Sequence, residues 1–102
     1  GNDISDFLIS IFEEFGYDSL KDIQESFIKV FEIANIICEE ININTQSKTG
    51  KTFLHFSCLS GYSKLAKYLV NISNIDLNIQ DHKGNTALHY SCFLELLPFI
   101  IR

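Results

Sequence analysis

The stretch Gly50-Lys-Thr-Phe-Leu-His55 recurs 34 positions later as Gly84-Asn-Thr-Ala-Leu-His89. From Gly50 to Cys58, six of nine positions are identical at that offset, which chance does not readily explain. A fixed period of about 20 to 50 residues is typical of stacked repeat proteins. The pairs that keep the register are Gly50/Gly84, Thr52/Thr86, Leu54/Leu88, His55/His89, Ser57/Ser91 and Cys58/Cys92, preceded by Asn44/Asn78 and Gln46/Gln80.

Each unit has the residues of a turn followed by two helices. Its glycine permits the positive φ of a tight hairpin tip, its threonine can cap a helix, and its leucine starts a buried face. Gly61 would turn the chain between an inner helix at 53–60 and an outer helix at 63–71. The structural motif consists of Gly50, Thr52, Leu54, His55, Gly61, Gly84, Thr86, Leu88 and His89.

Asp76 and Asn78 follow the outer helix at the end of the unit. Together with them, these motifs resemble those of ankyrin-repeat proteins. The resemblance covers residues 41–102 and implies an all-α ankyrin-repeat solenoid, built from helix-turn-helix repeats with short β-hairpin tips. It implies two repeats, at approximately 47–80 and 81–102, of which the second is incomplete. Since one repeat cannot bury its apolar face alone, neighbouring units are expected to stack on it.

Among the departures from the family pattern, which include Glu95 as the counterpart of Gly61, two bear most on the fold. Phe53 and Ala87 stand where the family has proline, which removes some pre-organisation of the helix start but leaves the fold possible. Arg102 would fall inside the expected second outer helix, so that we expect the apolar stretch 99–101 to lack a covering repeat in this sequence. With no Met in the chain and Gly1 at its start, we expect a fragment of a longer array, and self-association through the C-terminal edge is an alternative.

Residues 1–40 have the periodicity of two amphipathic helices. Ten acidic against two basic side chains give residues 1–46 a net charge of −8, whereas residues 47–102 have +3. We interpret residues 1–40 as an acidic helical cap or a degenerate first ankyrin repeat, with a separate helical tail as the third option. The apolar stripes expected to face the core are Ile4, Phe7, Leu8, Ile11, Phe12 and Phe15, then Leu20, Ile23, Phe27, Val30, Phe31, Ala34 and Ile37.

The resemblance implies a non-catalytic protein–protein interaction module that binds a protein partner through its hairpin tips and the concave face of its inner helices. Lysine and histidine at the tips would pair with acids, so we expect a partner with an acidic segment, and apolar residues would add contact energy. The alternative is a structural spacer within a larger transcription regulator or signalling protein, with binding or activity elsewhere. The expected partner-binding residues are Lys48, Thr49, Lys51, Leu59, Ser60, His82, Lys83, Asn85, Phe93 and Leu94.

Two patterns that could indicate a catalytic or metal site are weak. Residues 45–52 nearly spell a phosphate-binding loop, but Thr45 replaces its first glycine, and the equivalent stretch 79–86 has no lysine before its threonine. His55 and His89 lie one repeat apart, too far to share a zinc ion, and the resemblance assigns them to hydrogen bonds between adjacent hairpins. We therefore expect no enzyme activity, no metal and no cofactor.

The composition of the chain argues against several other classes of protein. The chain has 102 residues, 46% of them apolar, and a formal net charge of −5, which suits one globular domain. The basic residues are too few for a nucleic-acid binder, and no apolar run approaches the roughly 18 residues that span a bilayer. Three cysteines without a CxxC pair favour a reducing, intracellular location, cytoplasmic or nuclear, with Cys58 and Cys92 as small buried residues.

Overall fold

The computed structural model describes residues 4–15, 24–36 and 41–90. The described residues contain no strand, and the predicted all-α class is confirmed. Part of the second stripe and the predicted helices beyond residue 90 lie outside the described residues. The elements are α1 (Ile4–Phe15), α2 (Gln24–Ile36), α3 (Phe53–Ser60), α4 (Ser63–Val70) and the 3₁₀ turn η2 (Ala87–His89).

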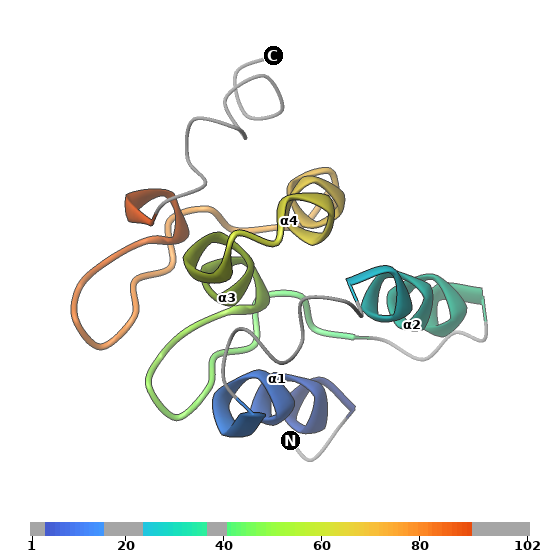
Figure 1. Ribbon diagram of the computed structural model, residues 1–102, viewed down its shortest axis with the longest axis horizontal. Helices are drawn as coiled ribbons and strands as arrows, with labels where there is room; N and C mark the ends of the chain where they lie inside the picture. The colour runs from blue at the N-terminus through green and yellow to red at the C-terminus, as the bar shows by residue number, and fades with distance from the viewer. Residues whose placement is uncertain (1–3, 16–23, 37–40, 91–102) are drawn as a thin grey trace.

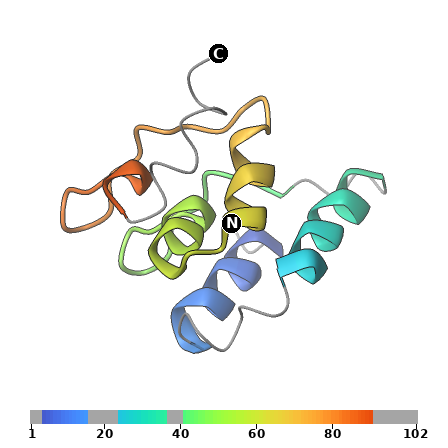
Figure 2. The same ribbon diagram turned by 45° about the horizontal axis from the view of Figure 1, so that its top comes forward.

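The helices form two layers. In Figure 1, α1, α3 and η2 follow one another in one layer, while α2 and α4 lie side by side in the other. The helices α3 and α4 make the predicted helix-turn-helix, and Gly61, with φ 72°, ends α3. The loops that precede α3 and η2 project from the same side of the molecule, away from the α2–α4 layer (Figures 1 and 2).

The central helix α3 begins where the sequence predicts. The Thr52 hydroxyl accepts a hydrogen bond from the His55 N–H at 3.3 Å, which caps the helix start. Every residue from 53 to 58 is buried, because α3 has α1, α4 and η2 packed around it. A helix that is buried on all sides normally lies in the core of a protein. Here α1, α4 and η2 cover α3 and place it in that core.

Five phenylalanines join the two N-terminal helices to this repeat. Phe12 of α1 lies 4.7 Å from Phe27 of α2 and 5.5 Å from Phe56 of α3, measured between ring centroids. Phe53 packs edge-on against Phe31 of α2 at 5.2 Å and against Phe12 at 6.0 Å. The residue that stands in place of the family's proline is therefore fully buried and fastens α1 and α2 to α3.

The buried face of α1 differs from the predicted stripe. Leu8 and Phe12 are buried as expected, but Phe7 is 65% exposed and Ile4 is also exposed. Ser5 takes the buried position instead, and its hydroxyl accepts the Asn42 N–H at 2.6 Å. This small side chain lets the backbone of residue 42 approach α1 closely, and Ile9, which is not in the predicted stripe, is also buried.

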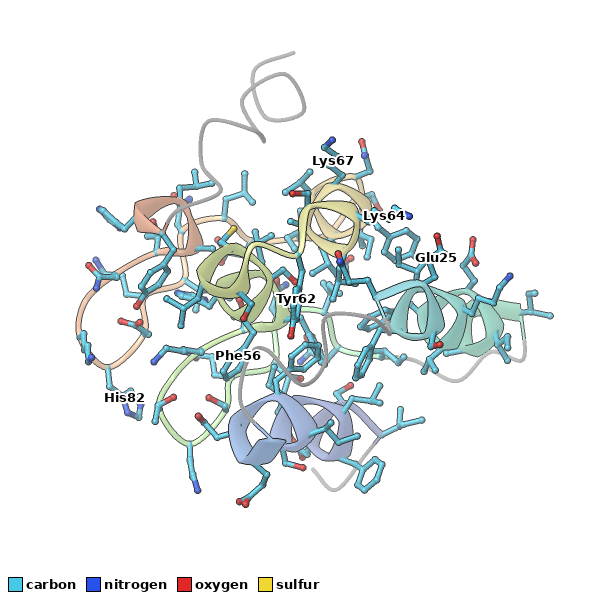
Figure 3. All side chains as sticks on the ribbon, viewed as in Figure 1. Glu25, Phe56, Tyr62, Lys64, Lys67 and His82 are labelled. Atoms are coloured by element: carbon cyan, nitrogen blue, oxygen red, sulfur yellow. The ribbon has the colours of Figure 1, made fainter. Side chains whose placement is uncertain are left out.

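The outer layer is joined by polar contacts. The Gln24 side chain accepts the Leu65 N–H at 3.2 Å and so satisfies a backbone donor in the first turn of α4. Glu25 and Lys64 form an exposed ion pair at 2.9 Å across the two helices (Figure 3). The hydrogen bond from Lys64 and the charge of its ammonium group lower the pKa of Glu25, although an exposed pair adds little to stability.

The corrected face of α1 predicts different effects for two phenylalanines of one helix. We expect Phe12→Ala to lower the free energy of unfolding by about 3 to 5 kcal/mol, because it opens a cavity within the aromatic cluster. Phe7→Ala, the matched control, should change it by no more than about 0.5 kcal/mol. Urea unfolding followed by circular dichroism measures both. Equal losses would contradict the observed face and favour the stripe predicted from the sequence.

Candidate functional site

The two projecting loops end in turns of the same build. The first tip consists of residues 47–50 and the second tip of residues 81–84. In each tip, the N–H of its last residue donates to the carbonyl oxygen of its first residue at 2.9 Å. In both, a second backbone hydrogen bond of 2.8 Å closes the base of the turn. The predicted β-hairpin tips are thus hairpin turns, and neither is flanked by a strand within residues 41–90.

The first tip is held in register with the second. The His82 N–H donates to the Thr49 carbonyl oxygen at 3.0 Å. The Gln46 amide donates to the carbonyl oxygens of Gly50 at 2.9 Å and Gln80 at 3.2 Å. Gly50 has φ 84°, and a β-carbon there would lie 2.6 Å from Cδ2 of His82, so the close approach requires glycine. The tips therefore form one continuous edge.

His55 links its own helix to the next repeat. Its Nδ1 accepts the Thr52 backbone N–H at 3.1 Å, so the neutral ring carries its proton on Nε2. Nε2 then donates to the Asn85 carbonyl oxygen at 2.9 Å. Burial lowers the pKa of His55 below its ordinary value, against the opposing effects of Asn85 and of the nearby Asp81 carboxylate. The imidazole therefore remains neutral and serves as a hydrogen-bonded connector.

Asp81 anchors the second tip from inside. One carboxylate oxygen accepts the backbone N–H groups of Lys83 and Asn85, each at 3.0 Å, and the other accepts the Tyr90 hydroxyl. Burial alone would raise the pKa of Asp81, but these hydrogen bonds and the charge of Lys51 lower it to about 2. The ionised carboxylate thus fixes the backbone of a loop that carries exposed side chains.

Lys51 lies inside the fold and not on the exposed surface of the first tip. Predicted as a partner-binding cation, it is buried, with its ammonium 3.8 Å from the Asp81 carboxylate and 3.5 Å from the Thr49 hydroxyl. A buried carboxylate is costly without a counter-charge, and Lys51 supplies one. This placement also gives the lysine of the near-match to a phosphate-binding loop a role within the fold.

The first tip contacts the acidic helix α1. One oxygen of Glu13 accepts the Thr49 hydroxyl at 2.6 Å and the Thr49 N–H at 3.2 Å. Burial alone would raise the pKa of Glu13, but hydrogen bonds from Ser47 and Thr49 and the charge of Lys51 bring it below its ordinary value. Lys48 extends to Glu14 of the same helix at 3.6 Å, and both side chains are exposed.

The other expected partner-binding residues occupy different positions around the tips. His82 and Lys83 are exposed on the second tip, where Figure 3 shows His82 at the outer end of the loop. Asn85, at its base, is half-buried. Leu59 and Ser60 are half-buried at the end of α3. Phe93 and Leu94 lie outside the described residues, as do Cys92 and the C-terminal edge.

Three polar residues of this region, Gln46, Asp81 and Glu13, have roles that were not predicted from the sequence. Gln46 and Gln80 stand at equivalent positions of the two repeats, and this spacing was a signal for the contact between them. Asp81, the first residue of the predicted second repeat, was not among the predicted site residues, yet it organises the tip. No pattern in the sequence pairs Glu13 with Thr49, because the contact depends on how α1 sits on the repeat.

The described residues contain no group of three or more histidine, cysteine, aspartate or glutamate side chains that could hold a metal ion. None of the helices within these residues is long and apolar enough to cross a membrane. The thiol of Cys58 is buried and is not in a disulfide. The candidate site is the surface of the two tips and the adjoining inner helices, where backbone turns and polar side chains are joined by the hydrogen bonds described above.

Comparison with known proteins gives one result. A family model described as ankyrin repeats (3 copies) matches residues 26–100, about three quarters of the chain. The match starts within α2, upstream of the repeat that the sequence shows clearly. A search of curated proteins and a search of solved structures found no match.

The contact between the tips predicts unequal effects for two alanine substitutions. Both glycines have a positive φ, but a β-carbon at Gly84 meets nothing within 4 Å. We expect Gly84→Ala to cost about 1 to 2 kcal/mol of unfolding free energy from backbone strain alone. Gly50→Ala should cost about 1 to 3 kcal/mol more, because its β-carbon overlaps His82. Urea unfolding measures the difference, and equal costs would contradict the tight contact between the tips.

The lowered pKa of His55 predicts a loss of stability in mild acid. The unfolded imidazole takes up a proton near its ordinary pKa of about 6.5, whereas the folded one resists it. The stability contributed by the neutral ring is present above that value and is lost as the pH falls through the folded-state pKa. We expect a lower unfolding free energy at about pH 5.5 than at about pH 7.5.

Two substitutions separate His55 from the rest of the chain. The decrease should shrink in His55→Gln and persist in His89→Gln, its equivalent in the next repeat. Carboxylates with lowered pKa values, such as Asp81 at about 2, titrate below this pH range. An unchanged pH dependence in His55→Gln would show that another group is responsible. Urea titrations at the two pH values provide the measurement.

Proposed function

The chain belongs to the ankyrin-repeat family, and we propose that it is a non-catalytic module that binds a protein partner through its tips and the concave face of its inner helices. Ankyrin repeats are in general protein–protein interaction modules. Stacked repeats offer extended surfaces on which side chains of successive units lie next to one another. We propose in particular that the exposed side chains of the second tip, His82 and Lys83, contact the partner.

The observation that carries the proposal is the build of the second tip. Its backbone is held by the buried Asp81 carboxylate and by the hydrogen bond from His82 to Thr49, while the side chains of His82 and Lys83 are exposed. A loop that is already ordered loses little conformational entropy when a partner binds. The arrangement therefore suits recognition better than a loop that must first fold.

We further propose that α1 and α2 form a degenerate first repeat. The helix α1 packs on α3 as an inner helix would, and α2 packs on α4 as an outer helix would (Figure 1). The family match that starts at residue 26 supports this assignment for α2. An intracellular location, cytoplasmic or nuclear, remains part of the proposal, and the buried thiol of Cys58 is compatible with it.

Affinity capture from a lysate of the source cells tests binding through the tips. We expect His82→Glu/Lys83→Glu to lose a protein that the parent chain retains, through a weakening of about tenfold or more. The control is Lys64→Glu/Lys67→Glu on the exposed side of α4 (Figure 3), which lowers the charge by 2 + 2 = 4, against 1 + 2 = 3 for the tip variant with histidine counted as neutral, and which also removes the Glu25–Lys64 ion pair. All variants must first show an unchanged thermal melt. Retention of the same proteins by all three chains, or of none, would instead favour a structural spacer.

A further inference from the structure

The hydrogen bonds that join the second tip to the first repeat end on backbone atoms of the second repeat. Three groups of the first repeat take part, and each meets an N–H or a carbonyl oxygen at 2.9 to 3.2 Å. They are the Thr49 carbonyl oxygen with the His82 N–H, the Gln46 amide with the Gln80 carbonyl oxygen, and Nε2 of His55 with the Asn85 carbonyl oxygen. These bonds recognise the shape of a turn and not the identity of its side chains.

The equivalent groups 34 positions later form an outer edge on the second tip. This outer edge consists of the Lys83 carbonyl oxygen, the Gln80 amide and Nε2 of His89, and none of them makes a hydrogen bond within the part of the chain that the structure describes. The ring of His89 is oriented as that of His55 is, because its Nδ1 accepts the Thr86 N–H at 2.9 Å and the proton is on Nε2. Gln80 and His89 are exposed, whereas His55 is buried.

Gly84 leaves room for a backbone against the outer edge. At Gly50, its equivalent, a β-carbon would lie 2.6 Å from Cδ2 of His82 and 2.8 Å from the His82 backbone nitrogen, so only glycine admits the second tip there. A β-carbon at Gly84 meets nothing within 4 Å, and Gly84 is exposed where Gly50 is buried. The outer edge thus offers the donors, the acceptor and the clearance of a surface that already holds one turn.

We propose that the outer edge binds a hairpin loop of the protein partner through the backbone of that loop. The inference rests on the proposed function and defines the chemistry of the partner, a turn with an outward N–H between two outward carbonyl oxygens. Exposed backbone groups at such an edge are a template for another chain, and main-chain hydrogen bonds supply the affinity. The exposed side chains of His82 and Lys83 belong to the same tip, so that one partner contacts them and the outer edge together.

A second copy of this chain fits the outer edge less well. The second tip of that copy already donates its His82 N–H to its own first tip. The first tip of that copy has α1 beside it, on the side of α3 opposite η2, where Glu13 binds Thr49 and Ser5 accepts the Asn42 N–H (Figure 1). Neither described tip of a second copy is therefore free to dock here.

A cyclic peptide tests the outer edge without the natural partner. The probe has the sequence of residues 79–86, closed head to tail, and retains the Asp81 carboxylate together with the two backbone N–H groups that it accepts. Titration of the probe into the isotope-labelled whole chain, followed by NMR, gives the affinity and identifies the amides that shift. We expect saturable shifts at residues 83–89 and none in α2.

Two glycine variants separate loss of clearance from backbone strain. We expect Gly84→Ala to weaken binding of the probe by about tenfold or more, because its β-carbon would overlap the incoming backbone as one at Gly50 overlaps His82. Gly61→Ala is the matched control, since Gly61 has φ 72° against 82° and its β-carbon also meets nothing within 4 Å. It should change the affinity by less than about twofold. Gln80→Ala removes an exposed donor and should weaken binding about fivefold.

Four results would count against the outer edge as the site of a partner's loop. The absence of saturable shifts in the parent chain overturns the proposal, and so does equal weakening in the two glycine variants. A parent chain that sediments as a dimer, while Gly84→Ala sediments as a monomer, would assign the outer edge to a second copy. Binding to this chain, but not to a longer natural chain with a third tip, would assign it to a further repeat.

The two proposals fail separately. Loss of a captured protein in His82→Glu/Lys83→Glu, combined with no binding of the probe, overturns only the role of the outer edge and leaves the proposed function intact. Binding of the probe, combined with capture that no tip variant changes, would overturn the proposed function.

Discussion

The contact of Phe53 with Phe12 and Phe31 is the constraint on which the rest of the structure depends. A single helix-turn-helix repeat exposes an apolar face and needs a neighbour to cover it. Here the cover comes from α1 and α2, and aromatic rings at 5.2 and 6.0 Å from Phe53 hold both of them against α3. The departure from proline at this position therefore provides an attachment for the N-terminal helices, beyond its effect on the start of α3.

The same attachment determines what the first tip presents to a partner. Because α1 is seated on α3, Glu13 reaches Thr49 and Glu14 reaches Lys48. The second tip is surrounded differently, because Asp81 holds its backbone from inside and the side chains of His82 and Lys83 are exposed. Two tips with similar backbones thus have different charged neighbours, and the packing of α1 beside the first tip causes the difference.

Local features of the fold could be predicted from the sequence, whereas contacts between distant segments could not. The inner helix at 53–60 matches α3, and the outer helix at 63–71 matches α4 to within one residue, because caps and turn residues act over a few positions. The buried face of α1 differs from the predicted stripe, because Ser5 lies against the distant residue 42 and not at the surface. The position of Lys51 likewise depends on Asp81, which lies 30 residues further along the chain.

The charge of a binding surface is decided by which ionised groups find partners inside the fold. Counted along the sequence, Lys48 and Lys51 make the first tip basic. The ion pair with Asp81 removes one of these cations from the surface, and the same carboxylate organises the next tip. Electrostatic recognition in general depends on the charged groups that remain accessible, so the composition of a tip does not by itself determine the charge that it presents. A charged hairpin motif therefore indicates where a repeat protein binds more reliably than what it binds.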